Sequence, residues 1–490
     1  MRKSGVLMHI SSLPSPWGIG TLGADAKKFI DFLAVSGQSY WQVLPVSPTG
    51  YGDSPYQSFS SYAGNPYFID LDILREWGLL EKSEYCGIGW GSDSEHVDFG
   101  LLHENRFKVL RKATKRLLQS LVSEFSDFCS NSDFWLDDYA LFMALKGSHG
   151  GASWSEWESS LRTREENALN EAREKLSSEI EFYKAVQFLF FRQWNELRKY
   201  ACDKGILIIG DVPIYVALDS ADVWAAPHLF MLDDNLVPID VAGCPPDGFS
   251  ADGQLWGNPL YNWNEIKNNG YSWWISRVKH QFELFDVLRI DHFRGFDEFY
   301  AIPFGSENAK HGVWRKGPGM ELFVAIKSAL GEKEIIAEDL GFLNDSVRKL
   351  LRDSGFPGMK VLQFAFDSRE DSDYLPHNFT RNCVAYTGTH DNDTIIGWFN
   401  TAPDEDVKKA REYLRIHEGE SVVKAMLCAL WGSVAELAIA SMQDVLELDG
   451  NARMNTPSTL GGNWQWRMKP DTNLEETSCW LKHITELYRR

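Results

Sequence analysis

The sequence predicts an α/β protein built on a (β/α)8 barrel that carries large helical and loop insertions. The first observation behind this prediction is a set of eight short apolar runs, each followed by a polar or Gly- and Pro-rich loop. Most of these runs lack strict alternation of apolar and polar residues, as expected of strands that are covered on both faces. The eight runs are Val6–Ile10, Tyr40–Leu44, Ile206–Ile209, Val287–Ile290, Glu334–Ala337, Lys360–Phe366, Cys383–Thr387 and Ala440–Leu446.

Helical patterns between several of these runs are the second observation. They span Ala24–Ser36, Met320–Leu330 and Leu343–Asp353. Strands that alternate with helices predict a parallel sheet, and eight such strands predict a closed barrel. The carboxyl ends of all the strands should then lie at one face, where barrel proteins hold their functional sites.

The length of the chain is the third observation. It has 490 residues, whereas a minimal barrel of this type needs roughly 250. We therefore expect one barrel domain over residues 1–490 with two large insertions. The first, 68–200, lies between the second and third strands and should be helical, because stretches such as Arg164–Tyr200 repeat apolar residues at spacings of three and four. The second, 217–280, follows the third strand and should be loop-rich, because Gly and Pro interrupt it.

The charge of the chain restricts its partners. Lys and Arg total 49 against 69 Asp and Glu, which gives a formal charge of −20. Such an acidic surface repels phosphate backbones and anionic lipids, so we expect neither a nucleic-acid partner nor a membrane partner. No apolar run reaches the roughly 18 residues that a membrane span requires.

Cysteine usage and the amino terminus predict a soluble, cytoplasmic protein. The seven Cys are scattered singly with no CxxC pair, so a disulfide framework and a zinc site are not expected. The apolar stretch at the amino terminus is too short for a signal peptide. The 19 Trp are mostly expected in a large aromatic core, although some could be stacking platforms for sugar rings.

Acidic residues follow the apolar part of four of the strand-like runs. They are Asp211, Asp291, Glu338 and Asp391. In a barrel they would converge on one pocket. Any one of them could equally be the N-cap of the following helix. Several together, beside the cationic or titratable side chains of Arg289, His292, Arg294 and His390, favour a shared site instead.

Two of these carboxyls should differ in charge. Arg289 precedes Asp291 by two residues, so the two side chains point to the same face of a strand and Arg289 can keep Asp291 ionised. Glu338, beside this negative charge, should have a raised pKa and stay protonated. One ionised and one protonated carboxyl is the pair that glycoside chemistry needs. A retaining mechanism requires about 5–5.5 Å between them and an inverting one about 6.5–9.5 Å, and both remain open at this point.

The residues around these acids resemble three strand-end motifs of the α-amylase clan. The motifs are Arg289-Ile-Asp291-His-Phe-Arg294-Gly, Ala337-Glu338-Asp339-Leu-Gly341 and Gly388-Thr-His390-Asp391-Asn392. Their order matches strands four, five and seven of that clan. The details resemble glycoside hydrolase family 77, the branch of amylomaltase and the disproportionating enzyme. Further motifs along the chain resemble the same family, among them His9-Ile-Ser-Ser-Leu-Pro14, Gly52-Asp-Ser-Pro-Tyr56, Gly210-Asp211-Val-Pro, Gly253-Gln-Leu-Trp256, Arg453-Met-Asn-Thr-Pro457 and Gly462-Asn-Trp464-Gln-Trp466.

The resemblance implies a role for each acid. Asp291 would be the nucleophile, Glu338 the general acid and then the general base, and Asp391 the ligand of the sugar hydroxyls beside the reacting carbon. Further residues would bind the sugar chain. They are Arg289, His390 and Asp211 around the reacting glucose, Tyr56 stacked on it, the subsite aromatics Trp256, Tyr51, Phe249 and Phe366, and the polar Ser54, Gln254 and Asn463. For each of the subsite aromatics, ordinary packing remains the alternative.

The implied activity is a 4-α-glucanotransferase that moves α-1,4-glucan segments between maltooligosaccharides or starch chains by a retaining double displacement. Both donor and acceptor would be glucans, with no cofactor and no metal, and the protein would be a monomer or a homodimer. The flexible loop around 244–258 would cover the acceptor and exclude water. Three alternatives remain, which are a glucan hydrolase of the same clan, a metal-dependent barrel enzyme and a non-catalytic glucan-binding protein.

Overall fold

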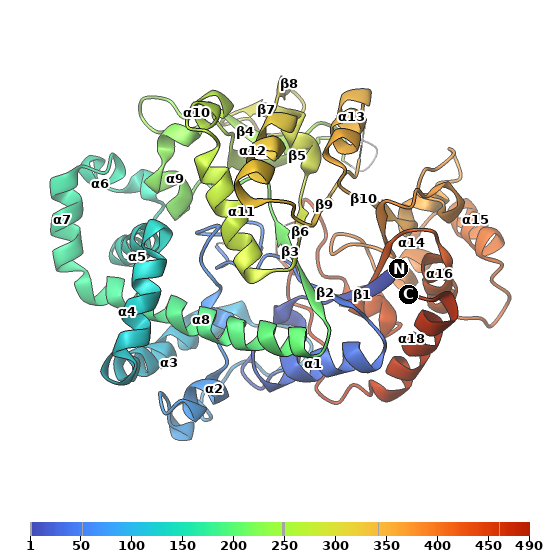
Figure 1. Cartoon of the computed structure of the whole chain (residues 1–490), viewed down its shortest axis with the longest axis horizontal. Helices are drawn as coiled ribbons and strands as arrows, with labels where there is room; N and C mark the ends of the chain where they lie inside the picture. Colours follow the sequence, from blue (N-terminus) through green and yellow to red (C-terminus); the bar gives the residue numbers. More distant parts are fainter. Residues whose placement is uncertain (1, 51, 247–249, 342, 460) are drawn as a thin grey trace.

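The centre of the molecule is a closed barrel of eight parallel strands (Figure 1). The computed structural model describes residues 2–50, 52–246, 250–341, 343–459 and 461–490. The strands run around the barrel in the order β1-β12-β11-β10-β9-β6-β3-β2, which confirms the predicted fold class. Their bounds are β1 (Lys3–Leu7), β2 (Tyr40–Gln42), β3 (Leu207–Val212), β6 (Val287–Ile290), β9 (Ile335–Ala337), β10 (Gly358–Val361), β11 (Cys383–Tyr386) and β12 (Leu437–Ser441).

Five of the eight predicted strands extend too far at their carboxyl ends, and three of them run on into helical turns. The apolar run that begins at Val6 continues past β1 into a buried 3-10 turn, η1 (Ile10–Ser12). The runs that begin at Lys360 and Ala440 start inside β10 and β12 and continue in the same way into η7 (Leu362–Phe366) and α17 (Met442–Val445). Because these turns are largely buried, they are as apolar as the strands, and hydrophobicity alone does not mark where a strand ends.

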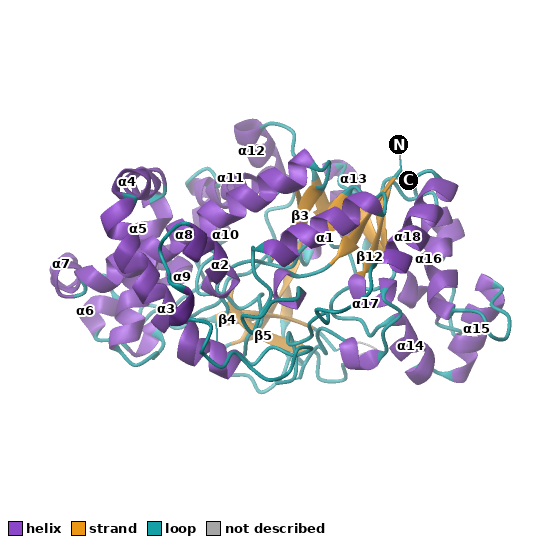
Figure 2. Ribbon diagram, turned by 90° about the horizontal axis from the view of Figure 1, so that it is seen from below, coloured by secondary structure: helices purple, strands orange, loops and turns teal. Residues whose placement is uncertain are grey.

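Helices cover the outside of the barrel (Figure 2). They include α1 (Ala24–Val35), α11 (Ser272–Leu284), α12 (Met320–Leu330), α13 (Asp345–Ser354), α14 (Ile395–Thr401), α15 (Asp404–Leu414), α16 (Val422–Gly432) and α18 (Glu475–Tyr488). Of the three predicted helices, α12 has the predicted bounds and α1 ends one residue early. The helix α13 begins two residues later than predicted, because the Asn344 side chain accepts a hydrogen bond from the Val347 N–H and caps the first turn.

Between β2 and β3 the chain forms a group of helices that lies beside the barrel (Figure 1). They are α2 (Leu71–Glu76), α3 (Phe99–Ser120), α4 (Val122–Asn131), α5 (Asp133–Ser148), α6 (Ser159–Arg162), α7 (Glu166–Lys175) and α8 (Ser177–Asp203). Two fully buried amides tie α8 to the segment after β2. Gln187 bonds both the N–H and the carbonyl of Gly64, at 2.7 and 3.0 Å, and Gln193 does the same with Asp70. Each amide thus satisfies a backbone pair that would otherwise be buried without partners.

The segment after β3 contains strands that the sequence does not predict. It forms α9 (Ala221–Ala225), β4 (Asp240–Cys244), β5 (Gln254–Pro259) and α10 (Trp263–Asn268). With β7 (Glu298–Pro303) and β8 (Val313–Lys316), these strands build an antiparallel sheet in the order β5-β4-β7-β8. Short strands that are broken by Gly and Pro give only a weak sequence pattern. In addition, two of the four strands of this sheet, β7 and β8, follow β6 in the chain.

Most of the aromatic residues belong to the core. One apolar cluster lies between the barrel and its helices, and a second contains side chains from all eight barrel strands. All 19 Trp lie in the described ranges, and Trp314 alone among them is classed as exposed, at 38%. No helix in these ranges is long and apolar enough to cross a membrane.

Candidate active site

The four strand-end acids lie at the carboxyl-terminal face of the barrel. Asp211 lies in β3, Asp291 and Glu338 directly follow β6 and β9, and Asp391 lies in the loop after β11. The strands β3, β6 and β9 are neighbours. The backbone continues this pairing, because the Asp291 N–H donates to Val212 and the Glu338 N–H donates to Ile290, both at 3.0 Å. The barrel therefore places the Asp291 and Glu338 backbones on adjacent strands.

None of these acids caps a helix. After Asp211, Glu338 and Asp391, the helices begin at the N-caps Ser220, Asn344 and Thr394, whose side chains accept backbone N–H groups. After Asp291, the 3-10 turn η6 (Phe293–Phe296) begins at His292, which makes no side-chain cap bond. The N-cap alternative left open by the sequence is therefore wrong for these positions.

Arg289 bridges two of the acids. Its guanidinium donates to both oxygens of Asp211, at 2.6 and 2.7 Å, and lies 3.0 Å from Asp291 Oδ1. The side chain of Asp211 has no exposed surface, whereas that of Asp291 is 29% exposed. Asp211 cannot touch a sugar from this position, so that part of the prediction is wrong. Its carboxylate instead orients Arg289 and accepts a 2.9 Å bond from the Tyr56 hydroxyl.

The environment of Asp291 raises its pKa without keeping it neutral. Burial raises the pKa, the charge of Arg289 opposes this rise, and the charge of Asp211 adds to it. The net pKa of Asp291 is about 6. At neutral pH the carboxyl is mainly ionised. An ionised carboxylate that is open on one side and held by a guanidinium on the other can act as a nucleophile.

Glu338 has a higher pKa than Asp291. Burial and the neighbouring charge of Asp291 raise its pKa to about 8, against the opposing effects of Arg289 and two backbone N–H groups. These groups belong to His292, at 2.7 Å from Oε2, and Leu340, at 2.8 Å from Oε1. His292 has a left-handed backbone with φ 51°, directly after Asp291. The pair therefore contains one mainly ionised and one mainly protonated carboxyl at neutral pH, as the sequence reasoning expects.

Asp391 completes the group from the opposite side of the barrel. Its side chain is 46% exposed, and its Oδ1 lies 3.3 Å from His390 Nε2. The Tyr56 ring stacks on the His390 ring at 4.9 Å, and its hydroxyl lies 3.4 Å from Nδ1. One face of Tyr56 is thus occupied by His390.

The hairpin of β4 and β5 brings an aromatic side chain next to His292. The half-buried Trp256 meets the His292 ring edge-on at 4.8 Å, and its Nε1–H donates to Gln254 Oε1 at 3.0 Å. Since the N–H of His292 binds Glu338, Trp256 is one residue removed from this carboxyl.

This arrangement has close relatives. The family model described as 4-alpha-glucanotransferase, glycoside hydrolase family 77, matches residues 8–473. The chain belongs to the 4-alpha-glucanotransferase family. The enzyme class and the glucanotransferase activity that the motifs implied are confirmed with it.

Other members of the 4-alpha-glucanotransferase family match over almost the whole chain. The enzyme of Streptococcus pneumoniae serotype 4 is 50% identical over 492 residues, which cover 100% of this chain and 97% of the relative. That of Clostridium butyricum is 47% identical over 485 residues, with 99% and 100% covered. The structure of an amylomaltase from Streptococcus agalactiae in complex with acarbose superposes with a TM-score of 0.98 at 46% identity, with full coverage of both chains.

Three predicted subsite aromatics of this glucanotransferase are not confirmed by the described part of the structure. Phe366 is fully buried against Trp398 and Tyr413, so its predicted place in a sugar subsite is wrong. The apolar run that contains Phe366 predicts a strand that ends at the carboxyl-terminal face of the barrel. In the structure η7 instead turns this side chain toward the surrounding helices. Tyr51 and Phe249 lie outside the described residues.

Two predicted polar ligands brace their own loops. Ser54 Oγ accepts the Tyr56 N–H at 3.2 Å, which fixes the turn before that ring. The Asn463 amide accepts the Thr456 N–H at 2.9 Å and donates to Thr459. Both side chains are only half-buried, so these contacts leave room for a ligand.

Sequence reasoning gives no role to several residues around the site. Trp464 packs against both Tyr56 and His390, at 5.8 and 5.7 Å, and Asn455 donates to Asp391 Oδ1 at 2.7 Å. Both residues lie in C-terminal motifs that resemble the family. The motifs therefore point to these residues, but they do not reveal which side chains the residues contact. Among the described residues, no group of three His, Cys, Asp or Glu side chains is placed to hold a metal ion.

Proposed function

We propose that Asp291 is the nucleophile, Glu338 the acid and then the base, and Asp391 the ligand of the reacting glucose in this glucanotransferase. The observation that carries the assignment is the placement of two differently surrounded carboxyls on adjacent strands, since Arg289 lies 3.0 Å from Asp291 whereas two backbone N–H groups donate to Glu338. Their pKa values are about 6 for Asp291 and about 8 for Glu338. A double displacement needs one ionised and one protonated carboxyl at the start.

In the first step, the Asp291 carboxylate attacks the anomeric carbon of the donor while the bond to the leaving glucan breaks. Glu338 gives its proton to the leaving oxygen, so the departing chain has a free 4-hydroxyl and the enzyme carries a β-glucosyl ester. Forming the ester removes the charge of Asp291. Because that charge helps to raise the pKa of Glu338, the pKa falls and Glu338 stays ionised for its second role.

In the second step, the 4-hydroxyl of an acceptor glucan attacks the anomeric carbon. Its proton moves to Glu338 and the bond to Asp291 breaks, which restores both carboxyls. Two inversions retain the α configuration. The acarbose bound to the Streptococcus agalactiae relative supports glucan chains as the ligands of this site.

Transfer exceeds hydrolysis when Glu338 deprotonates a sugar hydroxyl and not a water molecule. We place the acceptor on Trp256, because this ring packs on His292, whose N–H binds Glu338. The hairpin around 244–258 would then close over the acceptor and exclude water. Residues 247–249 of that hairpin lie outside the described ranges.

The product profile from pure maltotriose tests the overall function. We expect glucose and chains longer than maltotriose, with a constant number of reducing ends, because each cleavage is matched by one new linkage. Chromatography of the products together with a reducing-end assay measures both. A steady rise in reducing ends would identify a hydrolase, and no turnover a glucan-binding protein.

The pH dependence of kcat/KM tests the charge assignment. Activity should fall below about pH 6, where Asp291 gains a proton, and above about pH 8, where Glu338 loses its own. Initial rates of glucose release from maltotriose at constant ionic strength give this profile. A rate that stays level from pH 7 to well above pH 9 would contradict an acid with the pKa proposed for Glu338.

We propose a cytoplasmic protein that acts on storage glucans such as starch or glycogen, as a monomer or homodimer. Thiols spread over the fold without a disulfide support a reducing compartment, namely those of Cys86, Cys129, Cys202, Cys383, Cys428 and Cys479. Gel filtration with light scattering would determine the oligomeric state.

A further inference from the structure

We infer that Asn455 and Arg453 form a clamp that positions Asp391 for catalysis, an inference that rests on the proposed role of Asp391. This carboxyl needs positioning because of its place in the fold. It is the fifth residue after β11, in a loop without regular secondary structure, and its side chain is 46% exposed. A carboxylate that binds sugar hydroxyls more tightly in the transition state must hold one orientation before the substrate arrives.

Three hydrogen bonds join the clamp to the loop, and a fourth joins the two clamp residues to each other. The Asn455 side-chain amide donates to Asp391 Oδ1 at 2.7 Å, and its backbone N–H donates to the His390 carbonyl at 3.1 Å. The Arg453 guanidinium donates to the Asp391 carbonyl at 2.6 Å and to the Asn455 carbonyl at 2.8 Å. Asn455 thus fixes the rotation of the carboxylate, and Arg453 fixes both the backbone that carries Asp391 and that of Asn455.

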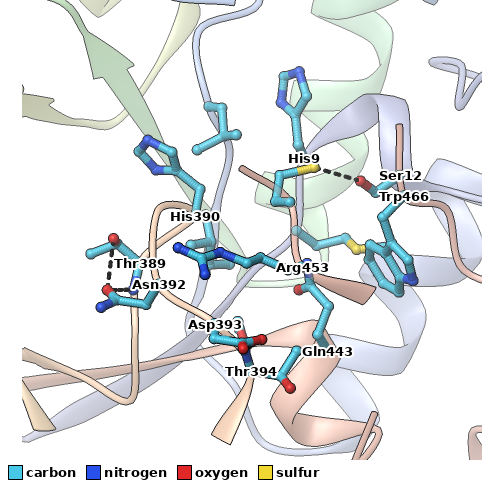
Figure 3. Close-up of a pocket in the computed structure, with 15 residues that line it drawn as sticks. His9, Ser12, Thr389, His390, Asn392, Asp393, Thr394, Gln443, Arg453 and Trp466 are labelled. Atoms are coloured by element: carbon cyan, nitrogen blue, oxygen red, sulfur yellow. Dashed lines mark hydrogen bonds between the residues drawn. The ribbon is translucent and has the colours of Figure 1, made fainter. Parts of the chain in front are cut away.

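The clamp is anchored in the barrel. Met454, between the two clamp residues, is 5% exposed and packs in the cluster that contains the barrel strands. Its carbonyl accepts the Trp464 N–H at 2.7 Å. Figure 3 shows Arg453 extending across a pocket toward the loop of Thr389, His390 and Asn392. A segment anchored by a buried side chain therefore holds an irregular loop across the pocket.

Other contacts hold the ends of the loop rather than the carboxylate. The Asn392 amide oxygen accepts from Thr389, and Gln363 donates to the Asp393 carbonyl at 2.7 Å. The buried Asp444 joins Thr387 to the start of α14. At the carboxylate itself, Asn455 makes the short contact, and His390 lies 0.6 Å farther away, at 3.3 Å against 2.7 Å. Loss of the Asn455 amide should therefore release the carboxylate and leave the loop in place.

The first test is Asn455→Ala. We expect kcat for maltotriose disproportionation to fall by about tenfold to a hundredfold, because a misplaced ligand of the transition state costs rate. KM should change by less than about threefold, because ground-state binding depends on the whole chain of subsites. A rise in KM with parental kcat would overturn the positioning role.

The sharper test is Asn455→Asp, which changes little in shape. The introduced carboxyl would face Asp391 Oδ1 at about the distance that the amide has, and two carboxylates this close repel each other, so both are ionised only at a raised pH. The pair binds one proton with a raised pKa, so repulsion acts above that pKa. Below it, the introduced carboxyl can donate as the amide did. The ratio of variant to parental kcat should therefore rise several-fold as the pH falls from 8 to 5, whereas the ratio for Asn455→Ala should stay level.

Asn451→Asp is the matched control, since it makes the same change at an exposed position four residues earlier. A level ratio for Asn455→Asp, or parental kcat in both Asn455 variants, would overturn the clamp. Asp391→Asn separates this failure from that of the proposed function. Parental activity in Asp391→Asn would reject the role of Asp391, whereas an inactive Asp391→Asn with active Asn455 variants would reject only the clamp.

Thermal melting identifies variants that do not fold. If Asn455→Asp does not fold, Arg453→Lys takes its place, because an ammonium cannot reproduce the two fixed bonds of the guanidinium. A lower kcat at an unchanged melting temperature would support the clamp, and parental kcat would overturn it.

Discussion

Glu338→Gln should lower the turnover of maltotriose by about 10²- to 10⁴-fold, because the amide can neither protonate the leaving oxygen nor accept the proton of the acceptor. Folding should be kept, although the amide must give up one contact. Both oxygens of Glu338 accept backbone N–H groups, from His292 and Leu340, and an NH₂ group cannot accept either bond. Initial rates and a thermal melt measure the two effects, and near-parental turnover would remove Glu338 from the acid/base role.

A change of donor distinguishes the loss of acid catalysis from a general loss of activity. An α-glucosyl fluoride releases fluoride without a proton, so Glu338→Gln should carry out the first step with this donor at a rate close to that of the parent. Loss of activity toward the fluoride and maltotriose to the same degree would mean that the variant is misfolded or that Glu338 has a binding role.

Asp291→Ala should have a larger effect, roughly 10⁴- to 10⁶-fold in kcat, as expected when a nucleophile is removed. No choice of donor should restore activity, because the fluoride also needs a nucleophile. Arg289 keeps its two bonds to the buried Asp211, so the variant should fold. Asp234→Ala, a change of the same kind at an exposed position, is the control for activity. Turnover of the fluoride donor by Asp291→Ala at more than about a hundredth of the parental rate would point to another nucleophile.

The barrel can be predicted from the sequence because its strands are covered on both faces and form continuous apolar runs. The same rule does not locate their ends, since η7 and α17 are also largely buried. The antiparallel sheet escapes prediction for a different reason. Its strands pair residues far apart in the chain, such as Gly243 with Tyr300, and no local pattern records such a contact.

The candidate site shows the same division between local and distant information. Arg289 and Asp291 lie on one strand two residues apart, so their ion pair follows from strand geometry. The contact of Asn455 with Asp391 joins residues 64 positions apart, and only the fold reveals it. Phe366 failed as a subsite residue because an aromatic side chain near a strand end can face either the mouth or the helical layer.

The covalent adduct formed by the Glu338→Gln variant reveals which residue is the nucleophile. Mixed with an α-maltosyl fluoride donor, this variant should form the ester and then lack the base that completes transfer, so the adduct should accumulate. Intact-mass measurement followed by peptide mapping locates the sugar. We expect one maltosyl group on the peptide that contains Asp291, and none when Asp291→Ala is added to the variant. A sugar on another residue, or labelling that persists without Asp291, would contradict this expectation.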